Sequence, residues 1–336
     1  MLKRIAIDAM GGEGGPELTV PAALGVLAGE SSLALTLVGD RARIEPFLQL
    51  SDAQADRCQV LHADSAISDE DSPHSVLRSA RRSSMYLAAE LVRDGAVEAM
   101  VSAGNTGALL MIGRHLLKTI PGIQKPAIVA TIPGATRQSY LLDVGANPEC
   151  TARQLFEFAV MGSVLAESLS GEPARVGLLN IGAEHFKGTD EVRQAAALLE
   201  QCKQLNYIGF IEANGLFESV ADVVVCDGFV GNVTIKSSAG VANVIQNMLL
   251  EELEQSLLAR LSERSSSSMI SRLIARINPQ RFNGATLLGL QGSVVKSHGN
   301  ATGEGFAYAI RQAMREVENA VPQLIGEKVA AIMSAN

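Results

Sequence analysis

Tryptophan is absent from this chain and the other aromatic residues are scarce, so that aromatics make up only 4% of the sequence. This composition does not suit an aromatic-rich β-sandwich. Glycine is abundant, with 31 residues among 336, and apolar residues make up 47%. These values exclude disorder as the main state, and they favour aliphatic helices packed on a parallel sheet with many glycine turns.

Cysteine is also rare, and Cys58, Cys150, Cys202 and Cys226 form no Cys-x-x-Cys pair. The sequence therefore predicts neither a disulfide framework nor a zinc site, and a reducing compartment fits. The formal net charge of −8 disfavours a nucleic-acid binder. The longest uncharged stretch, Ala99–Gly113, is too short to span a membrane. With no signal peptide in view, we expect a cytoplasmic protein whose membrane contact is at most peripheral.

Short apolar runs alternate with amphipathic segments along the chain, which predicts a doubly wound, mostly parallel α/β sheet flanked by helices in one large domain spanning residues 1–336. The predicted strands are Arg4–Asp8, Leu33–Val38, Gln59–His62, Ala99–Ser102, Ala127–Ile132, Ser139–Asp143, Val176–Asn180, Tyr207–Ile211 and Val223–Cys226. The predicted helices are Pro16–Ala28, His74–Val92, Thr151–Leu169, Asp190–Gln201, Asn232–Leu261 and Gly303–Val317. A helical hairpin insertion is expected at 246–282, around the serines at 265–268.

Polar or glycine-rich motifs follow the predicted strands, where open parallel sheets bind their ligands. They are Asp8–Pro16, Val101–Ala108, Leu142–Pro148, Asn180–Gly188, Asp222–Lys236 and Leu290–Gly299. Each motif alone also fits an ordinary turn, helix cap or solvated loop. Together they predict one large polar pocket that handles an anion, without a metal, since no carboxylate cluster or histidine pair has metal-ligand spacing.

In combination these motifs resemble the bacterial phosphate acyltransferases, the acyl-ACP:phosphate acyltransferases of phospholipid synthesis. The runs Ser-Ala-Gly-Asn-Thr-Gly-Ala at 102–108 and Asp-Gly-Phe-Val-Gly-Asn at 227–232 are the most specific. The resemblance implies a fold similar to isocitrate dehydrogenase and phosphotransacetylase. It also implies transfer of a long-chain acyl group from acyl carrier protein to inorganic phosphate, with no cofactor. A homodimer at the inner membrane face and a downstream glycerol-3-phosphate acyltransferase are implied as well.

The resemblance and the residue chemistry together suggest roles for individual side chains. Lys187 is expected to stabilise phosphate or oxyanion charge, while Asp143 and Asp227 are expected to orient Lys187, Lys236 or His298. The expected catalytic residues are Lys187, Asp143, Asp227 and His298. The expected phosphate- or oxyanion-binding residues are Gly11, Gly12, Ser102, Asn105, Thr106, Asn147, Asn180, Asn232 and Lys236. A nucleophilic Cys226 is the alternative, although a buried structural cysteine is commoner.

An acidic carrier protein needs a basic patch on this acidic chain. The candidates are Arg78, Arg81 and Arg82, and Arg260 and Arg264 near the serine tract. The hairpin suits a membrane surface through Leu257, Leu261, Ile270, Leu273 and Ile274, but carrier-protein or dimer contact fits it as well. The rival functions are a phosphotransacylase that uses acyl-CoA, a nicotinamide-dependent dehydrogenase on the related fold, and a non-catalytic membrane scaffold.

Overall fold

The computed structural model describes residues 2–68, 70–71, 76–78, 80–255 and 279–334. These residues form one sheet of eleven strands in the order β3-β2-β1-β4-β11-β10-β5-β6-β9-β7-β8. The strands are β1 Lys3–Asp8, β2 Leu33–Gly39, β3 Cys58–His62, β4 Ala99–Ser102, β5 Ala127–Ile132, β6 Ser139–Leu142, β7 Arg175–Leu179, β8 Asn206–Ile211, β9 Val223–Val225, β10 Ala285–Leu288 and β11 Ser293–Lys296.

The sheet consists of two parallel halves that point in opposite directions. β3, β2, β1, β4 and β11 are parallel to one another, and so are β6, β9, β7 and β8. Antiparallel pairing of β11 with β10, β10 with β5, and β5 with β6 reverses the direction between the halves. The carboxyl ends of β1, β4 and β11 therefore lie at one end of the strands, and we call this side of the sheet the first margin. The carboxyl ends of β6, β9 and β7 lie at the opposite end of the strands, which we call the second margin.

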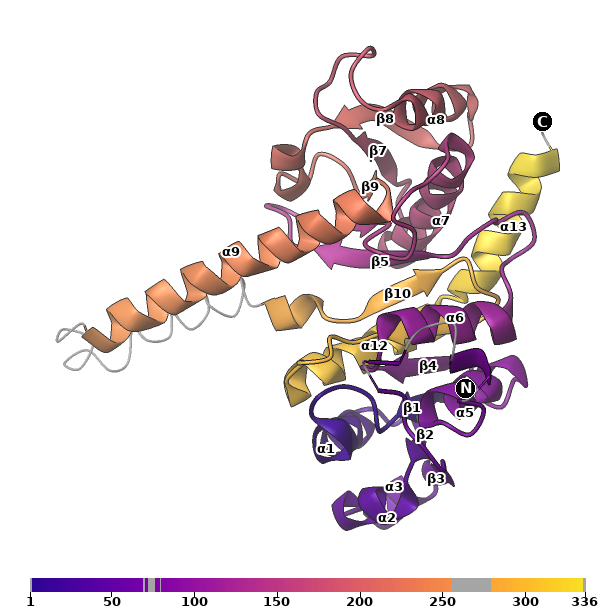
Figure 1. Ribbon diagram of the computed structural model, residues 1–336, viewed down its shortest axis with the longest axis vertical. Helices are drawn as coiled ribbons and strands as arrows, with labels where there is room; N and C mark the ends of the chain where they lie inside the picture. The colour runs from indigo at the N-terminus through magenta and orange to yellow at the C-terminus, as the bar shows by residue number, and fades with distance from the viewer. Residues whose placement is uncertain (1, 69, 72–75, 79, 256–278, 335–336) are drawn as a thin grey trace.

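Helices cover both faces of the sheet (Figure 1). The longer helices are α1 Gly15–Gly29, α5 Ser84–Arg93, α6 Thr106–Leu117, α7 Ala152–Ser170, α8 Asp190–Gln201, α9 Gly228–Gln255, α12 Gly303–Glu318 and α13 Val321–Ser334. The shorter ones are α2 Arg41–Ile44, η1 Glu45–Phe47, α3 Asp52–Ala55, η2 Ala213–Phe217 and η3 Pro279–Phe282.

The side chains of each strand alternate between the two faces, which separates the core into layers. In β1, Ile5 and Ile7 pack with α1 and α12 on one face, whereas Ala6 packs with α5 and α6 on the other. In the second half, α7 and α13 cover the same face as α1 and α12. The helix α9 contacts β5, β6 and η3, and it extends well beyond the body of the molecule (Figure 1).

The predicted fold class, a mostly parallel sheet flanked by helices, is confirmed. The sequence prediction omitted β10, β11, α6 and α13. It also ran a single helix from His74 to Val92, whereas the described residues 76–78 are helical, residues 81–82 form a turn, and α5 begins at Ser84. The Ser83 hydroxyl accepts the Tyr86 N–H and caps that end of α5. None of the described helices is long and apolar enough to cross a membrane. Most of the expected hairpin, 256–278, lies outside the described residues.

Candidate active site

The carboxyl ends of β1 and β4 bring two buried polar residues, Asp8 and Ser102, into direct contact. The Ser102 hydroxyl donates a 2.6 Å hydrogen bond to the Asp8 carboxylate, and the Ser84 side chain bonds the same carboxylate from α5. Burial raises the pKa of Asp8, while these hydrogen bonds and the positive charge of Lys296 oppose that rise. A buried acidic group thus lies at the first margin with a lysine nearby.

Glycine-rich loops close over this pair. A Cβ atom added at Gly11 would lie 2.7 Å from the backbone nitrogen of Gly104, so the loops after β1 and β4 pack backbone against backbone. Gly12 has a φ of +80°, and the next residue, Glu13, donates its N–H to the Gly299 carbonyl at 2.9 Å. The loops that follow β1, β4 and β11 therefore form one continuous polar surface.

Two basic side chains, Lys296 and His298, lie at this surface, and the charge of Lys236 is near enough to act on His298. The Lys296 ammonium donates to the Ala103 carbonyl at 3.2 Å. Partial desolvation lowers the pKa of His298, and the positive charges of Lys296 and Lys236 lower it further. Because His298 is exposed, water screens each of these effects. The direction of the shift nevertheless leaves the imidazole mainly neutral at pH 7, beside two lysine charges.

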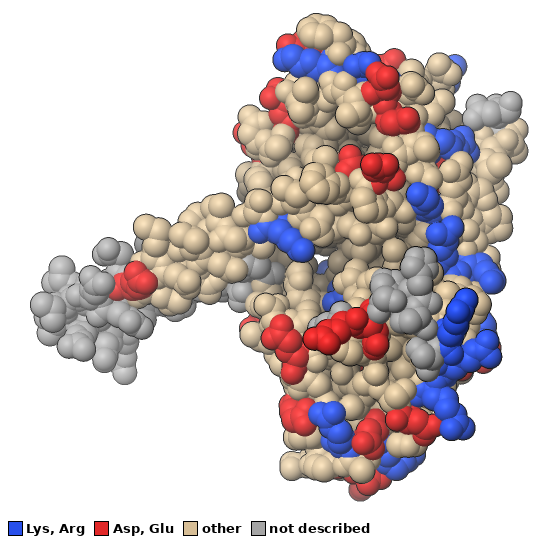
Figure 2. Space-filling view, viewed as in Figure 1, with Lys and Arg blue, Asp and Glu red and all other residues tan. Residues whose placement is uncertain are grey.

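Lys236 lies on α9, which begins at the second margin. The first turn of α9 presses on the loop after β6, where a Cβ atom added at Gly231 would lie 1.9 Å from the Asp143 carbonyl oxygen. At the rise of an α-helix, Lys236 lies about 7 Å further along the axis. Among the described residues, no carboxylate pairs with its ammonium. Figure 2 shows that the surface is hollowed below the inner part of α9.

The Asp143 carboxylate is buried at the second margin and binds its own loop. It accepts hydrogen bonds of 2.6–3.2 Å from the backbone N–H groups of Ile128, Gly145, Ala146 and Asn147. Burial raises the pKa of Asp143, and these bonds oppose the rise. The described contacts of the Asp143 carboxylate are therefore with this loop and with β5, rather than with the lysine or histidine expected as its partner.

Other expected site residues at the second margin organise the start of α9. The Asp227 carboxylate accepts the Val230 N–H at 2.8 Å, as an N-terminal helix cap does. The Asn232 side-chain amide donates to the Val144 carbonyl at 3.2 Å, which ties α9 to the loop after β6. The Asn147 amide donates to the Asp143 carboxylate at 3.0 Å.

Lys187 lies in the loop after β7, also at the second margin. Its ammonium pairs with Glu184 at 2.8 Å, and the Asn180 amide donates to the Lys187 carbonyl at 3.2 Å. Two large apolar side chains of the same loop, Ile181 and Phe186, are 79% and 75% exposed. The loop thus combines an accessible cation with an apolar surface.

At the first margin, Asn105 and Thr106 begin α6. The Asn105 side chain accepts the Ala108 N–H at 3.0 Å and donates to the Ser68 carbonyl at 3.4 Å. Thr106 is exposed in the first turn. The six motifs predicted to share one pocket are therefore divided between two margins.

The cysteines closest to these loops are poor nucleophiles. Cys226 is buried, and desolvation, together with the charges of Asp227 and Asp143, raises its thiol pKa well above the ordinary value. Desolvation also raises the pKa of the Cys150 thiol, to about 12. Both thiols are protonated near neutral pH, which argues against a cysteine nucleophile.

One of the expected basic patches can be placed. Arg78, Arg81 and Arg82 are exposed, and Arg82 pairs with Asp64 at 2.7 Å. Arg82 stands two residues before Ser84, whose side chain bonds Asp8, so the patch leads directly into the first margin. The remaining carrier-protein and membrane candidates, Arg260, Arg264, Leu257, Leu261, Ile270, Leu273 and Ile274, lie outside the described residues.

Comparison with known proteins assigns the chain to a family. A family model described as "Fatty acid synthesis protein" matches residues 3–324. A phosphate acyltransferase from Shewanella sp. (strain W3-18-1) is 46% identical over 332 residues, which cover 98% of this chain and 97% of that protein. The chain belongs to the phosphate acyltransferase family. This membership makes it an acyltransferase enzyme.

Solved structures confirm the expected likeness of fold to phosphotransacetylases. A phosphotransacetylase from Streptococcus pyogenes superimposes with a TM-score of 0.62 over 94% of each chain at 15% identity. The EutD phosphotransacetylase from Staphylococcus aureus gives a TM-score of 0.59 and 16% identity, covering 96% of this chain and 94% of that one. At such low identity the likeness concerns the fold.

The sequence did not predict three residues of the first margin as site residues. They are Asp8, Ser84 and Lys296. Asp8 ends a strand and opens a glycine-rich loop, so its position carried a signal that could have been used. Lys296 stands two residues before His298, at the end of β11, a strand that the apolar pattern did not indicate. In the described part of the chain, no three His, Cys, Asp or Glu side chains could together hold a metal ion.

Proposed function

We propose that this enzyme transfers a long-chain acyl group from the thioester of acyl carrier protein to inorganic phosphate, and so makes acyl phosphate for phospholipid synthesis. The observation that carries the proposal is that the glycine-rich loops of the first margin hold Lys296 and His298, and that the charge of Lys236 also acts on His298. Two lysine charges match a phosphate dianion, and exposed backbone N–H groups of such loops bind phosphate oxygens.

The reaction follows from holding phosphate beside the thioester carbonyl. A phosphate oxygen attacks the carbonyl carbon, and the resulting oxyanion is stabilised by nearby hydrogen-bond donors and cations. The C–S bond then breaks and the electron pair leaves on sulfur, as a thiolate whose conjugate acid has a pKa near 8.5. A neutral His298 would contribute a hydrogen bond to phosphate rather than a third positive charge.

Lys187 is proposed to stabilise the oxyanion or the phosphate from the second margin, with Asn180 supporting its loop. Its ion pair with Glu184 is solvent-exposed, and exposed pairs of this kind are weak, so the ammonium can be released to an anionic substrate. Lys187→Ala should lower kcat/KM by about 10² or more. Lys203→Ala, an exposed lysine after α8, is the matched control. A Lys187→Ala value within a few-fold of wild type would remove Lys187 from the mechanism.

Acyl carrier protein is proposed to dock on Arg78, Arg81 and Arg82, because this exposed patch leads into the first margin. Reversing the charges of Arg78 and Arg81 should raise KM for the acyl carrier protein substrate and leave KM for phosphate unchanged. An unchanged KM for the carrier substrate would discard this patch, and the patch near the serine tract would be tested next.

The hairpin at 246–282 is proposed to contact the inner face of the membrane or a second copy of the chain. The part of α9 that leads into it presents exposed apolar side chains at Val241, Val244, Ile245, Met248 and Leu250. Changing Leu257 and Leu261 to serine should abolish liposome binding and preserve a homodimer. Loss of the dimer instead would favour the packing role.

The test of the central proposal is phosphate-dependent release of acyl carrier protein from palmitoyl-ACP, with palmitoyl-CoA run in parallel. Formation of acyl phosphate from the carrier substrate is the expected result. Turnover of the coenzyme A thioester alone would identify a phosphotransacylase instead. Turnover of neither substrate by the folded protein would refute the proposal and favour the scaffold alternative.

A further inference from the structure

A cavity of about 640 Å³ lies apart from the first-margin loops, between the β5–β6 hairpin and α12. Its lining includes the guanidinium-bearing residues Arg137, Arg281 and Arg315 and the aromatic ring of Tyr308. No aspartate or glutamate is among the described residues that line it. Its volume is in the range of small-molecule sites and exceeds what inorganic phosphate alone would fill.

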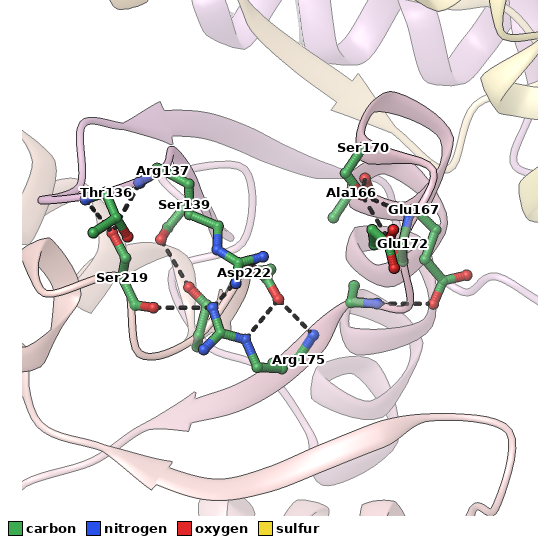
Figure 3. A network of polar contacts seen from close by, with 12 residues as sticks. Thr136, Arg137, Ser139, Ala166, Glu167, Ser170, Glu172, Arg175, Ser219 and Asp222 are labelled. Atoms are coloured by element: carbon green, nitrogen blue, oxygen red, sulfur yellow. Dashed lines mark hydrogen bonds and ion pairs between the residues drawn. The ribbon is translucent and has the colours of Figure 1, made fainter.

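The hairpin wall of this cavity is held rigidly. Figure 3 shows Ser219 placed against the turn, where its hydroxyl accepts the N–H groups of Thr136 and Arg137 at 3.2 and 3.3 Å. The same hydroxyl donates to the Arg137 carbonyl at 3.0 Å. A Cβ atom added at Gly134 would lie 2.1 Å from that carbonyl oxygen, so the turn leaves no room for a side chain at this position. The wall is thus held by hydrogen bonds within the chain.

The charges around the cavity leave a positive surplus. Asp222 bonds Arg175 through two contacts of 2.9 and 3.0 Å and also pairs with Arg137 at 3.2 Å. Burial alone would raise the pKa of Asp222, but the two arginines lower it overall. One negatively charged carboxylate is therefore shared by two positively charged guanidinium groups. Arg315, on α12, has no carboxylate partner among the described residues. Arg137 and Arg315 together can therefore neutralise a dianion.

From this geometry we infer that the cavity binds an organic phosphate monoester, a ligand distinct from the phosphate that the enzyme acylates. A monoester carries nearly two negative charges at neutral pH, which matches the two positive charges of Arg137 and Arg315. A guanidinium group can also donate two parallel hydrogen bonds to a pair of phosphate oxygens. Tyr308 supplies a flat apolar wall for the organic part. The inference goes beyond the proposed function and does not depend on it.

The cavity is joined to the first margin by one buried residue. Asn283 lines the cavity, and its amide donates to the Ser297 hydroxyl at 2.8 Å and accepts the His298 N–H at 3.0 Å. A ligand in the cavity would therefore lie beside the residue that positions the His298 loop.

The test is isothermal titration calorimetry on the full chain, which requires no turnover and so remains decisive if the proposed reaction is wrong. The probes are glycerol 3-phosphate and 4′-phosphopantetheine, with pantetheine and inorganic phosphate as comparisons. We expect at least one monoester to bind once per chain with a dissociation constant below about 1 mM, and more tightly than either comparison. Tighter binding of 4′-phosphopantetheine would point to a monoester with a long organic part, and tighter binding of glycerol 3-phosphate to one with a short organic part.

Substitutions of the lining arginines test whether the monoester binds in this cavity. Arg315→Gln and Arg137→Gln should each weaken it about tenfold or more, because each removes a charge-assisted contact. Arg114→Gln, an exposed arginine at the end of α6, removes the same charge away from the cavity and should leave binding unchanged. Thermal unfolding checks that all three fold. The inference is overturned if no monoester binds more tightly than inorganic phosphate, or if Arg315→Gln has no larger effect than Arg114→Gln.

Discussion

A buried carboxyl at the junction of the two half-sheets should make stability depend on pH. Glu316, on α12, is fully buried against β10 and β11, where the Thr286 hydroxyl and the Gln312 amide bond it. Burial raises its pKa from 4.5 to about 7 despite hydrogen bonds from Thr286, Gln312 and Ser293. The folded protein therefore retains a proton at this position that the unfolded chain releases.

The sign follows from proton linkage. Between pH 4.5 and about 7 the native state binds more protons than the unfolded state, so the contribution of Glu316 to stability falls as pH rises. The raised pKa corresponds to a loss of about 3 kcal/mol over the whole window, and of about 2 to 3 kcal/mol between pH 5 and pH 8. Glu316→Gln keeps a neutral group able to donate and accept hydrogen bonds and removes the ionisation.

Urea unfolding at pH 5 and pH 8 measures this effect. Relative to wild type, Glu316→Gln should gain about 2 to 3 kcal/mol of unfolding free energy on going from pH 5 to pH 8. Glu318→Gln is the matched control, since Glu318 ends the same helix, is exposed and pairs with Lys3 at 3.4 Å. The reasoning fails if the difference between wild type and Glu316→Gln is the same at both pH values.

Three further predictions concern the candidate site. Lys236→Met should raise KM for phosphate at least about tenfold, because it removes one of two lysine charges near His298. Ser102→Ala should lower the unfolding free energy by about 1 to 3 kcal/mol in urea titrations, since the buried Asp8 carboxylate loses a 2.6 Å hydrogen bond. Gly231→Ala should impair phosphate binding by displacing α9, whereas Gly240→Ala, which has open space around its Cβ position, should not.

These predictions can fail independently. An unchanged KM for phosphate in a folded Lys236→Met enzyme would move the phosphate site to the Lys187 loop. Equal stability of Ser102→Ala and wild type would show that water replaces the lost hydroxyl. Equal phosphate kinetics in the two glycine variants would show that the packing of α9 on the Asp143 loop does not position Lys236.

Much of the fold follows from local sequence signals. The strands at 4–8 and 33–38 are apolar runs bounded by polar residues, and helices such as α7 and α8 begin at threonine caps that their sequences display. The strands β10 and β11 have only four residues each, with two apolar neighbours apiece at Leu287–Leu288 and Val294–Val295. Patterns this short carry no periodicity, and pairing with β4 and β5 makes them strands.

The site was harder to predict because its layout depends on strand direction. From the sequence, Ser102, Asp143 and Asn180 all follow strands, and in an entirely parallel sheet they would meet at one margin. The antiparallel pairs made by β10 and β5 place Asp143 and Asn180 opposite Ser102 instead. Such pairing joins segments far apart in the chain, so no local pattern encodes it.

The helix α9 relates the two margins that the reversal of strand direction separates. It begins at Gly228, beside the Asp143 loop of the second margin, and it also contacts η3, which is followed by Asn283, the residue that bonds the His298 loop of the first margin. A helix that begins there can hold a side chain such as Lys236 at a fixed distance from the Asp143 loop, and the charge of Lys236 acts on His298 of the first margin. The close approach at Gly231 fixes where the helix begins. The spacing from Gly231 to Lys236 along one helix is thus the sequence feature that links the two halves of the candidate site.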